Sequence, residues 1–316
     1  MAKQNRYIGD TACGVLPLIK DSGMTSHDAV FAVRRLYSTA RVGHTGTLDP
    51  MASGVLIILV GRSAKAAEYI LHDRKRYIAT LRLGIETDTE DICGSVTAQH
   101  DIPSEPDIPD IIRHFTGEQK QIPPMYSAIK VGGQKLLDLA RQGITVEREP
   151  RDITVFSLDI SRTGRPEELL LDVSCSGGTY IRTLCADIGS YLGCGGCMAS
   201  LRRVENSGFS EKDCVTLTQL ESMTEEERLS LLRPTESLFA DLPALTPNEF
   251  YARLLRSGCT VLAKKLGADR SFSDTVGARL RLCDERELFF ARQRLDERFE
   301  PRGGCVQCIR RDAGSQ

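Results

Sequence analysis

The feature that most restricts the fold of this chain is the apolar run VLIILV at residues 55–60. The run has no polar side chain and is rich in β-branched residues, so it predicts a buried strand. The segment before it, GHTGTLDPMASG, consists mainly of small, hydroxyl-bearing and turn-forming residues, and its one acid is Asp49. A lone carboxylate on a loop beside a rigid strand is therefore the first position that needs an explanation.

Other segments show helical and strand periodicities in a mixed order. Residues 23–38 predict a helix capped by Ser26, and residues 63–73 predict a second helix capped by Ser63. Residues 75–85 alternate like a strand, with Tyr77 on the apolar face. Further predicted helices lie at 106–118 and 179–193, and further strands at 151–162 and 168–178. Because strict strand–helix alternation is absent, the pattern predicts an α+β fold with a mixed, mostly antiparallel central sheet flanked by helices.

A boundary is predicted near residues 239–247, where Pro243 and Pro247 coincide with a change in charge. Residues 245–316 contain more basic than acidic side chains, whereas the rest of the chain contains more acidic ones. Short strands are expected at 278–284 and 287–294, around the turn residues 284–287. We therefore predict two domains, 1–243 and 244–316. The second is small and β-rich, and its basic excess fits either an anionic partner or a solvated surface.

Several kinds of protein do not fit the sequence. The N-terminus lacks the apolar core of a signal peptide, and no apolar run approaches the roughly 20 residues that span a bilayer. The 11 cysteines have no framework spacing. We therefore expect reduced thiols, a cytoplasmic location and no membrane association.

Common cofactor and metal motifs are also missing. The chain has no Walker A loop, dinucleotide fingerprint or G-x-S-x-G elbow, and ETDTED lacks the glycine of a calcium loop. His27 and His44 lack zinc spacing with the cysteines. The pairs Cys194/Cys197 and Cys305/Cys308 could each be redox-active or half of a zinc site, but they lie in different predicted domains. We predict no metal and no cofactor.

Several blocks of the sequence together resemble one family. Residues 43–56, GHTGTLDPMASGVL, resemble the signature of the TruB family of tRNA pseudouridine synthases. The chain departs from the family pattern at Asp21, where proline is usual, and at Leu136, where tyrosine is usual. Further blocks keep the family's order between about residues 16 and 209: GMTSHDAVFAVRRL, KRYIATLRLGIETDTEDICG, QIPPMYSAIKVGGQKLLDLARQG, SCSGGTYIRTLCADIG and LRR with SGF.

The resemblance implies a pseudouridine synthase fold followed by a PUA-like RNA-binding domain. It implies an isomerase that converts the T-loop uridine of tRNA, position 55, to pseudouridine by flipping the base out of its stack. The implied partner is the T-arm of tRNA, bound by a monomer without guide RNA. A segment at about 121–152 would close over the RNA. Two other functions stay open: an RNA N-glycosylase, which would release free uracil, and a non-catalytic tRNA-binding folding chaperone.

The resemblance also implies roles for individual residues. Asp49 would act at the sugar C1′, as a nucleophile or as a stabiliser of positive charge. Arg182 would hold that carboxylate in its charged form, because burial alone disfavours the charge. Tyr77 would stack on the uracil and handle a proton. The structural alternatives are a turn aspartate, a surface arginine and a core tyrosine.

The remaining predicted residues would bind the substrate. His44 would occupy the space of displaced bases, and the small Gly46 and Thr47 would allow close approach of the RNA backbone. Tyr180 and Leu201 match pocket positions of the family, and Lys20 and Lys130 match its RNA contacts. In the C-terminal part, Arg279, Arg281 and Arg310 or Arg311 are expected to contact phosphates.

Overall fold

The computed structural model describes residues 12–70, 74–239, 244–245, 248–257, 259–266, 279–283, 288–295 and 301–311. Within these residues a 10-stranded sheet has the order β14-β1-β3-β12-β4-β11-β10-β7, with β2 paired to β3 and β13 paired to β12. These strands are β1 (Gly14–Lys20), β2 (Val42–Thr45), β3 (Ser53–Val60), β4 (Lys75–Leu83), β7 (Gly117–Gln121), β10 (Arg151–Arg162), β11 (Glu168–Cys175), β12 (Gly196–Asn206), β13 (Phe209–Ser210) and β14 (Val215–Thr216).

Most neighbouring strands of this sheet are antiparallel, as predicted. The two parallel pairs are β1 with β14 and β3 with β12. The second of these pairs is short, because only Ser53 with Arg202 and Gly54 with Arg203 are in register. The two halves of the sheet therefore meet along a very narrow seam.

The apolar run after the Asp49 loop forms β3, near the middle of the sheet. Alternate residues of this strand point to opposite faces. Leu56 and Ile58 belong to the larger core, whereas Val55 and Ile57 belong to a smaller core that includes Phe209. All of these side chains are inaccessible or nearly so. The prediction of a buried strand is confirmed, because both faces of the sheet are covered here.

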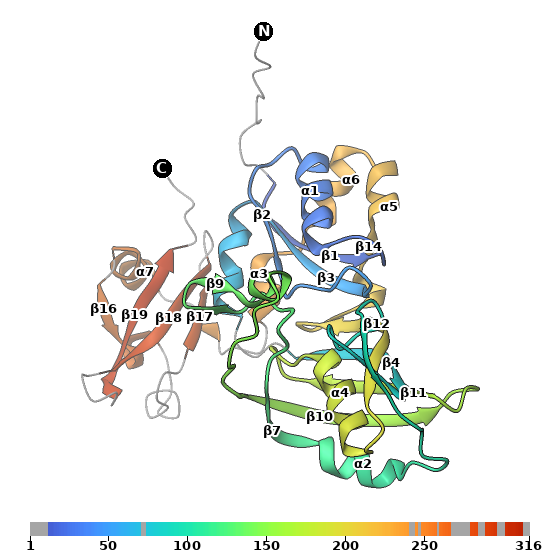
Figure 1. Ribbon diagram of the computed structural model, residues 1–316. Coiled ribbons are helices and arrows are strands. Elements are labelled where there is room, and N and C mark those ends of the chain that lie inside the picture. The colour runs from blue at the N-terminus through green and yellow to red at the C-terminus, as the bar shows by residue number, and fades with distance from the viewer. Residues whose placement is uncertain are drawn as a thin grey trace.

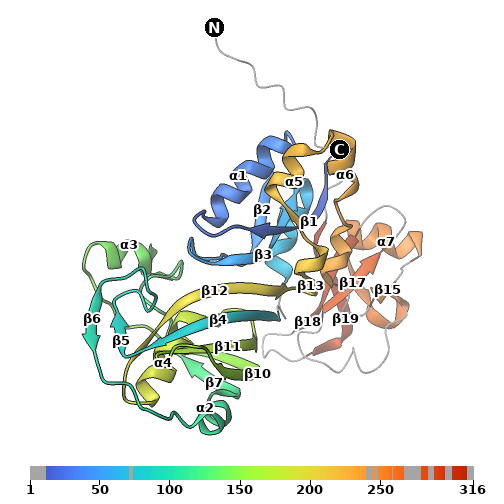
Figure 2. The ribbon, with the colours of Figure 1, turned by 90° about the vertical axis from the view of Figure 1, so that its right-hand side faces the viewer.

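Helices cover the larger core in two groups. Figures 1 and 2 show α1, α5 and α6 gathered at one end of the molecule, beside β1, and α2 and α4 at the other end, beside β10 and β11. The helices of the first group are α1 (Ser26–Leu36), α5 (Leu217–Ser222) and α6 (Glu225–Ser230), and those of the second are α2 (Ile108–Phe115) and α4 (Ile181–Tyr191). Each group thus packs against its own half of the sheet.

The segments that connect the strands are shorter elements. Between β4 and α2 lies a hairpin of β5 (Ile85–Thr87) and β6 (Val96–Gln99). Residues 121–152 contain β8 (Lys130–Val131), β9 (Gln134–Lys135) and α3 (Leu136–Arg141). The 3₁₀-helices are η1 (Gly61–Tyr69), η2 (Glu211–Asp213), η3 (Thr235–Phe239) and η4 (Ala263–Leu266).

The predicted cap of the first helix is wrong by one residue. Thr25 is the N-cap of α1: its hydroxyl accepts the amide hydrogen of Asp28, and the Asp28 carboxylate accepts that of Thr25. This reciprocal arrangement satisfies two backbone donors at the helix start. Ser26 is the first helical residue, and its hydroxyl instead contacts the loop that contains Asp49.

The predicted helix at 63–73 also needs correction. The structure has a 3₁₀-helix, η1, that begins at Gly61, and no side-chain hydrogen bond caps it. Ser63 is buried, and its hydroxyl lies 2.6 Å from Thr235 Oγ1 and 3.3 Å from Cys13 Sγ. The Ser63 hydroxyl thus forms hydrogen bonds with residues far away in the sequence and does not cap a helix. Residues 71–73 lie outside the described part.

The C-terminal part forms a 5-stranded sheet of order β15-β17-β18-β19-β16. Figure 2 shows it with α7 beside the larger sheet. The elements are β15 (Ala244–Leu245), α7 (Glu249–Arg256), β16 (Thr260–Leu262), β17 (Arg279–Cys283), β18 (Leu288–Leu295) and β19 (Pro301–Arg311). The two predicted strands are present as β17 and β18. The predicted turn at 284–287, and the side chains of Arg279, Arg281, Arg310 and Arg311, lie outside what the structure describes. No helix in the described residues is both long and apolar enough to span a bilayer.

Candidate active site

The loop that carries Asp49 is held in place by α1 and the segment before it. The Leu48 amide donates to Ser26 Oγ at 2.9 Å, and the Ser26 hydroxyl lies 3.1 Å from the Leu48 carbonyl oxygen. The Gly23 amide donates to the Pro50 carbonyl at 2.8 Å. Backbone groups on both sides of Asp49 are therefore anchored, which gives its carboxylate a defined position.

Arg182 binds the Asp49 carboxylate through two nitrogens. Its Nε lies 2.9 Å from Oδ2, and its Nη2 donates to Oδ1 at 3.5 Å. The Arg182 side chain is 6% exposed, whereas that of Asp49 is 34% exposed. The carboxylate is thus oriented from the protein side and still open on the other. The predicted pairing of these two residues is present in the structure.

Three further groups fix the guanidinium. Arg182 donates to the carbonyl oxygens of Thr89 and Tyr126, each at 2.9 Å, and its Nη1 lies 3.7 Å from Asp91 Oδ2. Arg182 is in the first turn of α4, where the helix dipole disfavours a cation by about 0.3–1 kcal/mol. Hydrogen bonds to charged groups are worth about 1.5–3 kcal/mol each, so the carboxylate and carbonyl contacts outweigh the dipole.

The acidic run ETDTED provides this support, although sequence analysis only rejected it as a calcium loop. Asp91 Oδ1 accepts the Thr89 hydroxyl at 2.9 Å and the Cys93 amide at 3.0 Å. The Thr87 hydroxyl donates to the Asp91 carbonyl at 2.7 Å. The turn therefore presents a carbonyl and a carboxylate to Arg182. Sequence reasoning missed Asp91, and the only available signal was its place in the family-like block.

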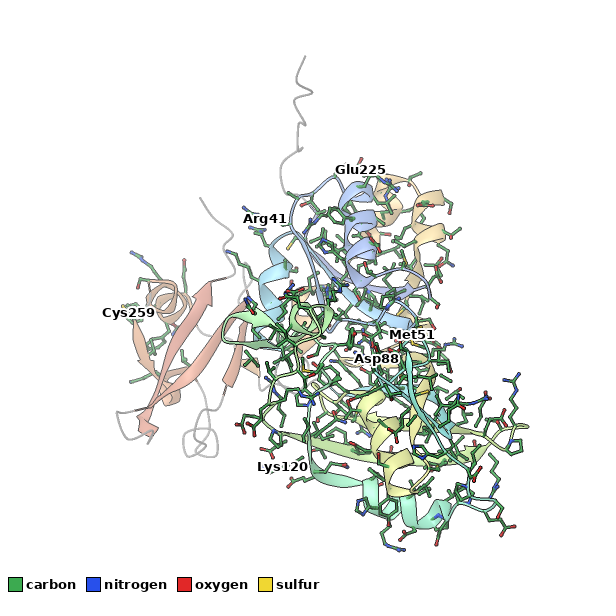
Figure 3. All side chains as sticks on the ribbon, viewed as in Figure 1. Arg41, Met51, Asp88, Lys120, Glu225 and Cys259 are labelled. Atoms are coloured by element: carbon green, nitrogen blue, oxygen red, sulfur yellow. The ribbon has the colours of Figure 1, made fainter. Side chains whose placement is uncertain are left out.

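Glu90 lies in the same turn and faces α4. It has a positive φ of 62°, and its Oε2 accepts the Thr183 hydroxyl at 2.5 Å. Burial raises the pKa of the Glu90 carboxyl, which the Thr183 hydrogen bond and the Arg182 charge partly offset. Figure 3 labels Met51, which follows Asp49 by two positions, and Asp88 of the acidic run, and Met51 Sδ lies 4.0 Å from Cys93 Sγ, just after that run. The acidic turn and the Asp49 loop are thus neighbours.

A row of paired residues crosses the sheet beneath the loop. Lys20 on β1 pairs with Gly54 on β3, Gly54 with Arg203 on β12, and Arg203 with Tyr77 on β4. Residues opposite each other on neighbouring strands point to the same face. Leu201, two positions before Arg203, extends this face beside Ala79. The sheet therefore brings Lys20, Tyr77 and Leu201 onto one face at the seam.

Tyr77 is 7% exposed and belongs to the larger core. Among the described residues its hydroxyl has no hydrogen-bond partner. Leu201 is 8% exposed and belongs to the same core. Both therefore contribute to packing, and the Tyr77 hydroxyl makes no hydrogen bond within the described residues.

Lys20 is fully buried and lies below the loop. Its Nζ donates to the carbonyl oxygens of Met24 at 2.7 Å, Asp21 at 2.9 Å and Pro50 at 3.4 Å. Burial lowers the pKa of the Lys20 ammonium, and the nearby Asp21 and Asp49 charges oppose this shift. In this structure Lys20 supports the backbone of the Asp49 loop and of the segment before α1.

Gly46 and Thr47 are exposed on the same loop. Gly46 has φ of 71°, and an added Cβ would lie 2.9 Å from Lys75 Nζ. Arg203, which is 1% exposed, donates to the Gly46 carbonyl at 3.0 Å and to the Val55 carbonyl at 2.7 Å. Lys75 and Arg203 thus place two cations under this part of the loop. Sequence analysis quoted both within family-like blocks without assigning them a role.

His44 lies on β2, and its Nδ1 is buried with no hydrogen-bond partner among the described residues. Burial lowers the pKa of His44, and the charges of Arg203 and His27 lower it further. The ring is therefore neutral near pH 7, which suits contact with bases better than with phosphate.

Tyr180 is the N-cap of α4, and its own side chain makes no capping hydrogen bond. Its amide donates to Gln121 Oε1 at 2.8 Å, and Gln121 Nε2 donates to the Tyr180 carbonyl at 3.0 Å. Gln121 thereby fixes the helix start that positions Arg182.

Lys130 is exposed and pairs with Lys135 in the β8–β9 hairpin. Among the described residues, no hydrogen bond or ion pair joins Lys130 to the Asp49–Arg182 pair.

Of the two C-x-x-C pairs, the structure describes the side chains of Cys194 and Cys197. Cys194 and Cys197 are buried where α4 packs on β12, and burial raises the pKa of both thiols. The side chains of Cys305 and Cys308 lie outside the described part. Among the described residues, no group of three or more His, Cys, Asp or Glu side chains could hold a metal ion.

Models of known protein families and several known proteins match this chain. Residues 34–181 match the model of the TruB family pseudouridylate synthase N-terminal domain, and residues 182–240 match the tRNA pseudouridylate synthase B C-terminal domain. The tRNA pseudouridine synthase B of Alkaliphilus oremlandii (strain OhILAs) is 48% identical over 69% of this chain and 73% of its own length. That of Aromatoleum aromaticum is 44% identical over 84% of this chain and 86% of its own.

The fold is also similar to a chain in a crystal structure of a Cbf5-Nop10-Gar1 complex. The TM-score is 0.72 at 24% identity, and the match covers 95% of this chain and 84% of that one. This match shows the fold, whereas the family models and the relatives show the family. The chain belongs to the TruB family of pseudouridylate synthases.

Proposed function

We propose that this protein converts uridine 55 in the T-loop of tRNA to pseudouridine, as a stand-alone cytoplasmic monomer that needs no guide RNA, metal or cofactor. The observation that carries the proposal is the contact of Asp49 with the buried Arg182. The relatives named tRNA pseudouridine synthase B support tRNA as the substrate.

The reaction breaks the N1–C1′ bond of uridine and joins C1′ to C5 of the same base. The proton on C5 must leave and N1 must gain one, so the net composition is unchanged. Asp49 supplies the carboxylate beside C1′, where it attacks the sugar or stabilises the developing positive charge. Its 34% exposed side chain is open to a substrate, and Arg182 keeps it oriented.

The neighbouring residues have roles that fit their positions. The Tyr77 ring stacks on the flipped uracil, and its hydroxyl, which has no partner among the described residues, handles a proton. His44 takes the space left by displaced bases, which a neutral ring can do without desolvating a charge. Tyr180 and Leu201 complete the pocket around the base. Extrusion of the base is needed because a stacked uridine cannot be reached.

Other residues would bind the parts of the RNA outside the reacting uridine. Gly46 and Thr47 let the backbone approach, and the cations beneath them favour phosphate. Residues 121–152 close over the T-arm with the exposed Lys130 on phosphate. Residues 1–243 form the catalytic domain, and residues 244–316 form a PUA-like RNA-binding domain.

The test is to incubate the purified protein with unmodified tRNA transcript and map pseudouridine, with free uracil measured in parallel. Wild type should modify position 55 and release no uracil. Asp49→Asn should abolish product while its Kd for tRNA stays within about tenfold, which corresponds to roughly 1.4 kcal/mol.

The matched control is Glu221→Gln, because Glu221 is an exposed acid outside residues 121–152, and its pair with the exposed Arg35 spans 4.0 Å. Exposed pairs contribute about 1 kcal/mol or less, so this variant should keep full activity. Appreciable turnover by Asp49→Asn would refute the assignment of the carboxylate. Release of uracil would indicate an N-glycosylase, and binding without either product would indicate a chaperone.

A further inference from the structure

Helix α1 carries an exposed aromatic side chain with two polar neighbours. Phe31 is 53% exposed. The His27 ring packs against it in an edge-to-face arrangement, with centroids 4.6 Å apart, and the Arg34 guanidinium carbon lies 5.3 Å from its ring centroid. Single exposed apolar residues are common on protein surfaces. The combination with an imidazole and a cation is what distinguishes this one.

The three residues form a continuous strip. Positions 27, 31 and 34 follow the i, i+4, i+7 pattern, which puts them on one side of the helix over about 10 Å. The strip begins next to Ser26, whose hydroxyl contacts Leu48 in the loop that carries Asp49. The exposed ring is therefore on the helix that anchors Asp49.

Contacts within the protein already order this strip. Arg34 Nη2 donates to the Val42 carbonyl on β2 at 3.2 Å, and Arg34 Nε is buried without a hydrogen-bond partner among the described residues. The guanidinium is held between β2 and the Phe31 ring, so it needs little further ordering to bind a ligand. The ring receives a cation–π contact from the same group.

The strip is also joined to β2, the strand that carries His44. Arg34 donates to the Val42 carbonyl, and Val42 precedes His44 by two positions on this strand. His44 is a proposed base contact, so an exposed aromatic ring on the neighbouring helix suits a further unpaired base.

We propose that His27, Phe31 and Arg34 form a binding surface for a second unpaired nucleobase of the substrate RNA, which stacks on Phe31 while Arg34 attracts the adjacent phosphate. The proposal rests on the proposed function, because it takes RNA as the substrate. Unpaired bases are commonly bound by aromatic rings combined with arginine. An exposed ring beside a cation presents both features.

The chain contains a matched control for this surface. Phe156 on β10 is 48% exposed, and the Arg74 guanidinium carbon lies 5.0 Å from its ring centroid. Figures 1 and 2 show β10 and α1 at opposite ends of the molecule. Phe156 therefore has a similar local chemistry at a different place.

The experiment compares Phe31→Ala, Phe31→Leu, Phe31→Trp and Phe156→Ala with wild type. Kd for unmodified tRNA transcript and the kcat and KM of pseudouridine formation are measured, and thermal unfolding verifies that each variant is folded. Phe31→Ala and Phe31→Leu should raise Kd and KM about 5- to 20-fold, since leucine keeps apolar bulk without a π-face. Their kcat should stay within about twofold of wild type, because the ring is not at the reacting base. Phe31→Trp and Phe156→Ala should bind like wild type.

Wild-type Kd in both Phe31→Ala and Phe31→Leu would overturn the proposal, as would an equal loss in Phe156→Ala. Leucine that binds as well as phenylalanine would also overturn it, because this would indicate an apolar contact and not base stacking. If wild type binds tRNA but forms no pseudouridine, the proposed function fails. The stacking surface is then still decided by the ratio of Kd values.

Discussion

At the scale of single residues, the buried guanidinium of Arg182 fixes the orientation of the Asp49 carboxylate. Removing one partner of a buried ion pair typically costs about 3–5 kcal/mol, because the remaining charge is left unpaired. Here Arg182 has Asp49 on one side and Asp91 with two carbonyl groups on the other. The guanidinium therefore keeps three partners besides Asp49.

The substitution Arg182→Lys keeps the positive charge at this position but removes the planar guanidinium and its several hydrogen bonds. An ammonium cannot reach Asp49 and both carbonyls of Thr89 and Tyr126 at once. We expect kcat to fall at least about 100-fold, as for a lost preorganised donor, and the free energy of unfolding to fall by roughly 2 kcal/mol. Steady-state kinetics and urea denaturation measure the two effects.

The control for this substitution is Arg202→Lys. Arg202 also binds a carboxylate through two nitrogens, at 2.6 Å and 2.9 Å from Glu211, but its side chain is 60% exposed. Exposed pairs contribute little to stability, so both measurements should stay near wild type. A wild-type kcat in Arg182→Lys would reduce Arg182 to a structural residue.

At the scale of elements, the seam between β3 and β12 determines where the site can form. Gly54 faces Arg203 across this seam with φ of 106°, and an added Cβ would lie 2.2 Å from the Arg203 carbonyl oxygen. A close approach of this kind needs glycine both for its backbone angle and for the missing side chain. The row from Lys20 to Tyr77 depends on it.

Gly54→Ala should therefore lower the free energy of unfolding by about 3 kcal/mol or more, since the clash is with backbone and cannot be relieved by a rotamer change. Gly117→Ala isolates the backbone angle, because Gly117 has φ of 108° and nothing within 4 Å of its added Cβ. That variant should lose about 1 kcal/mol. Urea denaturation at one temperature compares the two, and equal losses would mean that the close approach at the seam is unimportant.

At the scale of the whole molecule, two sheets divide the proposed work. The 10-stranded sheet carries the Asp49–Arg182 pair, and the 5-stranded sheet belongs to the basic C-terminal part. Phosphate contacts provide salt-sensitive affinity without reading sequence or performing chemistry. The second sheet should thus affect binding and leave the reaction itself intact.

Truncation near Leu245 tests this division. The shortened protein should bind tRNA more weakly and with a flatter dependence of log Kd on log salt, and it should still form pseudouridine slowly at high RNA concentration. Kd values across a salt series for the full-length and truncated proteins provide the comparison, with circular dichroism to show that the larger part stays folded. Identical slopes and affinities would assign the C-terminal part another task.

Several local features of this protein follow from the sequence alone. The uninterrupted apolar run at 55–60 and the alternation around Tyr77 predict β3 and β4, because side-chain burial follows from periodicity along a strand. The order of the motif blocks indicates the family and, with it, the pairing of Asp49 with Arg182. These features depend on neighbouring positions or on recognisable patterns.

Other features were decided only by the tertiary structure, because they join residues far apart along the chain. Ser26 and Ser63 look like helix caps, but their hydroxyls have partners 22 and 172 positions away. Arg203 and Asp91 carry no local sign of their contacts with the Gly46 carbonyl and with Arg182. The sequence by itself determined four strands of the large sheet, β3, β4, β10 and β11, together with α1, α2, α4 and the acid that is central to the proposed chemistry. Only the packed sheet placed Lys20, Arg203 and Tyr77 in one row, because register between strands depends on the whole core and not on any single segment.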